Sequence, residues 1–83
     1  MRAAELGELL ETLGVPVLGY REDDGYLGAS VRVTDTVHVE ISPEGLASVV
    51  QINGETDFRF HDARTEVRDI IYDLVAAGAV VLH

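Results

Sequence analysis

The residues best placed to hold a metal ion are His38 and Glu40, which lie two positions apart in an alternating segment. Side chains two apart on a strand project from the same face of a sheet. A zinc site needs at least a third ligand, and His61 is the one that another segment offers. A solvated polar strand face is the competing interpretation. The sequence therefore allows a small metal-binding or hydrolytic domain built on His38, Glu40 and His61.

Nucleophilic catalysis has less support in the sequence. It needs a nucleophile, a base and a group that orients the base. The hydroxyl groups of Ser30, Ser42 and Ser48 lie in no glycine-bounded elbow, and there is no cysteine to supply a thiolate. No glycine-rich segment leads into a helix in the pattern that holds a phosphate. We therefore expect a protein that is not an enzyme and has no cofactor.

The charge of the chain is strongly negative. Its 83 residues include fifteen acidic side chains and six arginines but no lysine, for a net charge of −9. A field of this sign disfavours direct binding of nucleic acids and of anionic membranes, and it favours basic surfaces on other proteins. The same excess of acids would also serve solubility or a salt-loving host.

The candidate partner-binding residues combine acids with apolar side chains expected at the surface. The acids come from the first helix and the first turn, and the apolar groups come from outward positions on the sheet. We expect the acids to steer a basic partner and the apolar groups to supply affinity. The residues are Glu5, Glu8, Glu11, Tyr20, Glu22, Asp23, Asp24, Tyr26, Val50 and Ile52.

An amphipathic helix is predicted over residues 3–13. Its leucines recur with the helical period and share one face, whereas the glutamates lie away from it. Gly14 is placed to end the helix in a left-handed cap, and Pro16 prevents its continuation. The leucines are Leu6, Leu9, Leu10 and Leu13.

A second helix is predicted over residues 63–77. Asp62 has the side chain and position of an N-cap, and Gly78 is placed to end the helix. One face is apolar and another is acidic. The apolar face consists of Val67, Ile70, Ile71, Leu74 and Val75, and the acidic one of Glu66, Asp69 and Asp73.

The segments between the helices are predicted to be five strands joined by tight turns, which makes neighbouring strands antiparallel. Asn53-Gly54 is the strongest hairpin signal. A two-residue turn there places Ile52 opposite Glu55, and hence Val49 opposite Phe58 and Ala47 opposite Phe60. Val50 and Ile52 then point outward. The strands are 15–21, 26–34, 37–41, 46–52 and 55–61, and residues 79–82 either add an edge strand or pack as a tail.

Together these elements predict one α+β domain over residues 1–83. A five-stranded antiparallel meander sheet forms one layer, and the N-terminal and C-terminal helices form the other on one face of the sheet. The opposite face is left to solvent or to a partner. No signal peptide or membrane-spanning run is visible, so we expect a cytoplasmic location.

Size, charge and helix–meander–helix order resemble those of phage or mobile-element inhibitors such as anti-CRISPR proteins. They are also similar to those of immunity proteins and small acidic secretion chaperones. The resemblance rests on these bulk properties and on no motif. It implies a non-enzymatic interaction module that binds a basic protein surface. One alternative is a self-associating assembly protein, a homodimer paired through Val50 and Ile52 or through residues 79–82. The other is the metal-binding or hydrolytic domain.

Overall fold

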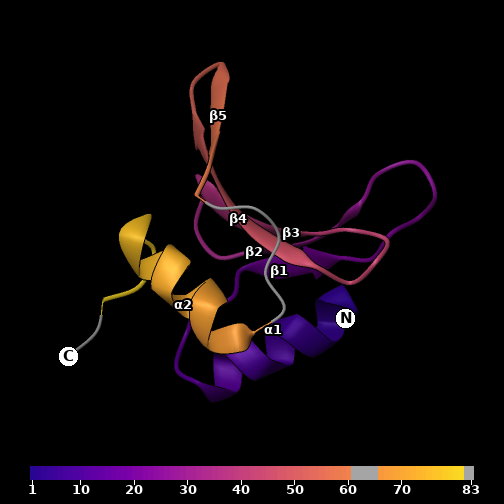
Figure 1. Cartoon of the computed structure of the whole chain (residues 1–83), viewed down its shortest axis with the longest axis horizontal. Coiled ribbons are helices and arrows are strands. Elements are labelled where there is room, and N and C mark those ends of the chain that lie inside the picture. Colours follow the sequence, from indigo (N-terminus) through magenta and orange to yellow (C-terminus); the bar gives the residue numbers. More distant parts are fainter. Residues whose placement is uncertain (61–65, 82–83) are drawn as a thin grey trace.

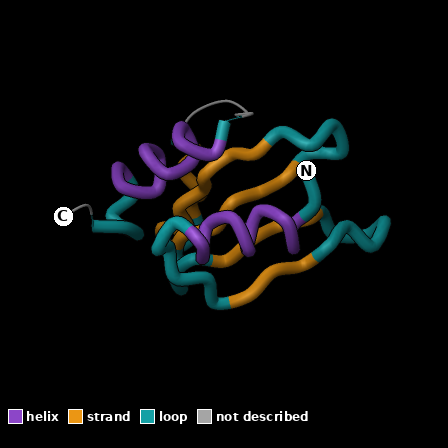
Figure 2. The backbone as a smooth tube through the Cα atoms, turned by 90° about the horizontal axis from the view of Figure 1, so that it is seen from below, coloured by secondary structure: helices purple, strands orange, loops and turns teal. Residues whose placement is uncertain are grey.

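A computed structural model describes residues 1–60 and 66–81 of the chain. The strands form one antiparallel sheet in the order β1-β2-β3-β4-β5, and both helices lie against the same face of it (Figures 1 and 2). This confirms the predicted two-layer α+β meander. The elements are α1 (Ala3–Thr12), β1 (Gly19–Arg21), β2 (Ala29–Arg32), β3 (Val37–Ile41), β4 (Ala47–Asn53), β5 (Thr56–Arg59) and α2 (Val67–Ala76).

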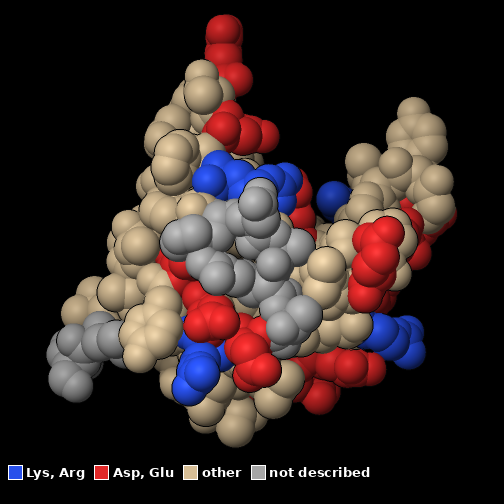
Figure 3. Space-filling view, in the orientation of Figure 1, with Lys and Arg blue, Asp and Glu red and all other residues tan. Residues whose placement is uncertain are grey.

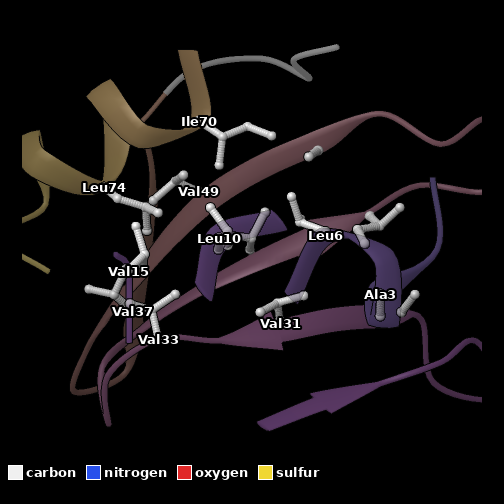
Figure 4. Packing of buried hydrophobic residues seen from close by; sticks show 14 residues of the cluster. Ala3, Leu6, Leu10, Val15, Val31, Val33, Val37, Val49, Ile70 and Leu74 are labelled. Atoms are coloured by element: carbon white, nitrogen blue, oxygen red, sulfur yellow. The ribbon is translucent and has the colours of Figure 1, made fainter. Parts of the chain in front are cut away.

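The core lies between the helices and the sheet. Leu6 and Leu10 of α1 point toward the sheet, as do Ile70 and Leu74 of α2, and all four are fully buried (Figure 4). Two other leucines predicted for the buried face of α1, Leu9 and Leu13, are exposed. Helical positions turn by about 100° per residue, so this pair lies at the flank of the stripe rather than at its centre. The sheet residues of the core include Val31, Val39 and Val49.

Both helices end at a glycine in the left-handed region, as predicted. Gly14 has φ of 89° and Gly78 has φ of 77°. After α1, the Val15 N–H donates to the Leu10 carbonyl at 2.8 Å and the Gly14 N–H to that of Glu11 at 3.0 Å. The end of α2 has the same pattern: the Ala79 N–H donates to the Leu74 carbonyl and the Gly78 N–H donates to the Val75 carbonyl. This is the Schellman motif, which satisfies the last carbonyls of a helix.

The start of α2 differs from the prediction. Glu66 has an extended backbone, with φ of −99° and ψ of 130°, so the described helix begins at Val67 instead of residue 63. The predicted Asp62 cap and residues 63–65 fall outside the described residues. At the other end, residues 79–81 form no strand, and Ala79 and Val80 pack against the core instead, which is the tail alternative for the described part of this segment.

The first two strands are shorter than predicted because the loop between them has its own hydrogen bonds. The Asp24 carboxylate accepts the N–H groups of Tyr26 at 2.9 Å and Leu27 at 2.6 Å. The Asp23 carboxylate accepts the Gly25 N–H at 2.8 Å. Such local bonds from aspartate compete with the strand ladder. Residues 22–28 therefore form a projecting loop, which we call the first arm.

The β4–β5 register also differs from the prediction. Asn53 pairs with Thr56 and Gln51 with Phe58, so the turn residues are Gly54 and Glu55. The predicted turn at Asn53-Gly54 would need a positive φ at both residues. In the described chain only glycines have positive φ, and Gly54 has φ of 62°. A glycine first in the turn meets the requirement of a type II′ hairpin, and the pairing moves accordingly.

Candidate binding surfaces

The sheet face away from the helices is a trough between two arms. The first arm and the outer part of the β4–β5 hairpin, which we call the second arm, both rise on this side (Figure 1). The hollow between them has a volume of about 580 Å³. Its charged and titratable lining residues are Arg21, Arg32, His38, Glu40 and Arg59. Arginine atoms are visible in the notch between the arms in Figure 3.

Strand register places the trough residues in two rows that cross the sheet. Cross-strand neighbours share a face, so each row projects into the trough. One row runs Arg32, His38, Val50, Arg59, and the other runs Arg21, Ser30, Glu40, Ser48. Polar and charged side chains therefore dominate this face, whereas valine dominates the opposite one.

An ion pair crosses the trough over β4. Arg59 Nη2 donates to Glu40 Oε2 at 2.7 Å, and His38 Nε2 lies 3.3 Å from Glu40 Oε1. Glu40 is on β3 and Arg59 is on β5, so the pair passes above the strand between them. The two β4 residues of the rows, Val50 and Ser48, are only 2% and 6% exposed. The predicted exposure of Val50 is wrong because charged side chains from both neighbouring strands lie beside it.

The electrostatics of this group keep Glu40 ionised. Its partial burial would raise the pKa of the carboxyl, but hydrogen bonds from Arg59 and His38 and the charge of Arg59 lower it further than burial raises it. The net pKa of Glu40 lies below its ordinary value, so the pair with Arg59 is charged at neutral pH.

The metal hypothesis names three residues, two of which the structure describes. His38 and Glu40 do share a face, as predicted, and they contact each other. Within residues 1–60 and 66–81, no group of three histidine, aspartate or glutamate side chains is arranged to hold a metal ion. The proposed third ligand, His61, lies outside the described residues, so the three-ligand site stays a prediction.

A second surface lies on the solvent side of α1, which we call the α1 outer face. Its glutamates, Glu5, Glu8 and Glu11, are exposed and form no ion pair with any residue that the structure describes. Leu9 is 44% exposed and Leu13 is 57% exposed. They are one helical turn apart and so lie next to each other. The face consists of Glu5, Glu8, Leu9, Glu11 and Leu13. The helical spacing predicted that both leucines lie on the buried face, but their place at the flank of the apolar stripe leaves them exposed.

Glu22 has a structural role that the sequence did not reveal. Its carboxylate accepts the Ala4 N–H at 2.9 Å and the Ala3 N–H at 3.2 Å, in the first turn of α1. These groups have no partner within the helix, so Glu22 caps α1 from the first arm. The bond from Ala4 is the largest cause of the lowered pKa of Glu22, although burial acts in the opposite direction.

The remaining predicted residues do not form one patch. Tyr20 pairs with Val31 and so faces the helix side of the sheet, at its free edge. Tyr26 is exposed on the first arm, and Asp23 and Asp24 are engaged within that arm. Ile52 is exposed, as predicted, but it lies on β4 in the second arm. Only the three α1 glutamates share one helix.

In the described part of the chain, neither helix has the length and hydropathy needed to cross a bilayer. Comparison with protein-family models, with curated proteins and with solved structures finds no match to this chain.

Proposed function

We propose that the protein is a non-enzymatic interaction module that binds a basic protein surface through the α1 outer face. The observation that carries this proposal is the exposure of Leu9 and Leu13, side by side on a helix whose glutamates have no described ion-pair partner. Exposed leucines bordered by unpaired acids give a helix both an apolar contact and a charge to offer a partner.

The chemistry of the partner follows from this arrangement. Amphipathic helices bind in grooves, where apolar side chains one turn apart fill pockets and charges on the rim set the orientation. The matching surface is a shallow apolar groove bordered by lysine or arginine. A module of this kind acts as an inhibitor where the groove also serves the partner's own ligand.

Self-association through the sheet has less support. That hypothesis depends on exposed Val50 and Ile52 or on a strand at residues 79–82. Ile52 is exposed but stands on the sheet without an exposed Val50 beside it. Val50 is buried, and residues 79–81 form no strand. A helix-mediated contact with a different protein agrees better with the exposed groups on α1.

Affinity capture from a lysate of the source cells, at low and at high salt, tests the proposal. The wild-type chain is compared with L9S/L13S, which removes the apolar contact, and with E5Q/E8Q/E11Q, which removes the three charges. We expect one partner to be captured by the wild type at low salt. Both variants are expected to lose it, and high salt to weaken its capture, because screened charges steer poorly.

The matched control is D35N/E55Q/D57N, which changes the net charge equally at three exposed positions in the β2–β3 turn and the second arm. This variant is expected to retain the partner. If the control and E5Q/E8Q/E11Q lose the partner to the same extent, net charge alone attracts it and the α1 outer face is not the binding surface. Capture of no basic protein at low salt would also contradict the proposal.

A further inference from the structure

The arginines of this acidic chain are concentrated on one face. Arg21, Arg32 and Arg59 all line the trough and make up half of the six arginines in the sequence. Among the lining residues that the structure describes, Glu40 is the only acid. A cationic hollow in a molecule of net charge −9 is opposite in sign to the protein as a whole.

Two of these arginines are arranged as a clamp. Arg21 on β1 pairs with Ser30 on β2. Arg32 lies on β2 as well, two residues after Ser30 and opposite Gly19 of β1. Residues in this diagonal relation have Cα atoms about 7–8 Å apart and project from the same face. Nothing lies within 4 Å of the position that a Cβ on Gly19 would take, so the floor beside Arg32 is open. A smaller hollow of about 220 Å³ meets the trough here, and both are lined by Arg21, Ser30 and Arg32.

The guanidinium groups of the clamp retain free donors. Arg21 Nε donates to the Gly28 carbonyl at 3.3 Å, which orients the side chain and leaves its terminal nitrogens available. Arg32 lies 3.7 Å from Asp35, but the two side chains are 63% and 91% exposed. Such a surface pair contributes only about 0–1 kcal/mol. The nearby Asp24 carboxylate accepts the Tyr26 and Leu27 N–H groups, and it interacts with the charge of Arg21 without forming an ion pair with it. Arg59, in contrast, is held by Glu40 at 2.7 Å.

We propose that Arg21, Arg32 and Ser30 bind the phosphate group of a small phosphate monoester. Two guanidinium charges match a dianion, and planar guanidinium forks fit phosphate oxygens in two-point contacts. The Ser30 hydroxyl, on the strand between Arg21 and Glu40, supplies a further donor. A carboxylate carries one charge and has two oxygens, so it uses one fork and leaves the second arginine unmatched.

The surroundings of the clamp select for a compact ligand. Acids border the trough on both arms, with Asp23 and Asp24 on the first and Glu55 and Asp57 on the second. A nucleic acid that extended beyond the trough would meet these like charges. A single phosphate group inside the trough contacts the arginines and stays clear of the arm tips.

Titration followed by ¹H–¹⁵N chemical shifts tests this site directly. The probes are inorganic phosphate, phosphoserine, acetate and a short single-stranded DNA. We expect phosphate and phosphoserine to shift the amide signals of residues 19–21 and 30–32 and acetate to bind at least about tenfold more weakly, since one charged contact is lost. A stronger response to phosphoserine than to phosphate supports a monoester ligand, whereas a response to phosphate alone would overturn the monoester assignment in favour of the free ion.

The variants R21Q and R32Q are each expected to weaken phosphoserine binding by about tenfold or more, the effect of losing one charge-assisted contact. R68Q, which removes an exposed arginine on α2, is the matched control and should leave the binding unchanged. R21K keeps the charge but not the fork and should give an intermediate affinity. Four outcomes would each overturn the proposal. Two concern affinity: wild type and R21Q bind phosphoserine equally, or acetate binds as tightly as phosphoserine. The others are tighter binding of the DNA and no response to 10 mM phosphate, about the range of weak anion sites.

Discussion

The two faces of the sheet are buried in different ways. On the helix side, leucine and isoleucine from α1 and α2 cover a layer of valines. On the open side, Val50 and Ser48 are almost as well buried, although none of the described helices and strands lies over them. There the cover is a salt bridge between β3 and β5 with the aliphatic stem of Arg59. A strand residue can therefore be buried by charged neighbours as well as by a second layer.

The two faces of this small sheet are therefore expected to contribute differently to stability. The helix side is sealed by apolar groups that must stay in place for the chain to fold. The open side is covered by long side chains that lie partly in water and can rearrange at small cost. Four predictions test how far the two faces differ, beginning with the largest expected change in stability.

L10A is expected to lower the free energy of unfolding by about 2–5 kcal/mol, because it leaves a cavity in the fully buried contact between α1 and the sheet. Urea denaturation followed by circular dichroism measures the change. L9A, one residue earlier on the same helix, is the control and should change stability by less than about 0.5–1 kcal/mol. Similar losses in the two variants would show that α1 does not pack on the sheet through the stripe described above.

V49A and V50A compare adjacent residues that face opposite sides of β4. We expect V49A to cost about 2–3 kcal/mol, since the core around it cannot relax fully into the space. V50A is expected to cost about 1.5 kcal/mol or less, close to the transfer free energy of the lost methyl groups, because Arg59 and His38 can move inward. Equal costs in urea denaturation would mean that the open face is packed as tightly as the core.

The Glu40–Arg59 salt bridge should contribute little to the free energy of unfolding, although the contact is short. Both side chains are nearly half exposed, so a double-mutant cycle of E40Q and R59Q should give a coupling of about 0.2–1 kcal/mol. The folded pKa of Glu40 is below its ordinary value, so this contribution is complete above pH 4.5 and is lost as the pH falls through the lowered folded pKa. A coupling that persists at pH 2 would contradict this assignment.

E22Q is expected to have the smallest effect at neutral pH, because the glutamine carbonyl can still accept an N–H of α1. E22Q removes the part of the pH dependence of stability that comes from the Glu22 carboxyl group. The pKa of Glu22 is lowered in the folded state, so the wild type loses stability as the pH falls below 4.5, and the variant should lose less. Thermal unfolding between pH 3 and 7 compares the two (roughly the range in which carboxyl groups titrate). Parallel pH profiles would show that the Glu22 carboxylate does not cap α1.

The features that the sequence predicted are those set by short stretches of chain. The glycine caps after Leu13 and Ala77, the tight turns and the helical stripes follow from neighbours a few residues apart. The meander order follows from the short turns. These local rules were sufficient for the architecture of the described residues.

The features that the sequence did not predict depend on residues far apart in the chain. Glu22 caps a helix 18 residues earlier, and the cover over Val50 joins side chains 19 residues apart. Neither pairing has a local pattern. The clustering of arginines in the trough also appears only when the register brings β1, β2 and β5 to one face. The residues of the candidate binding surfaces were therefore harder to predict than the helices and strands.

The meander has a kinetic consequence. Every strand of the described sheet lies beside the strand that precedes or follows it in sequence, and α1 contacts β1 and β2 while α2 contacts β4. The chain therefore closes mainly short loops as it folds, which keeps the entropic barrier low. Refolding after dilution from denaturant should be rapid for a protein rich in β-structure, with successive hairpins forming one upon another.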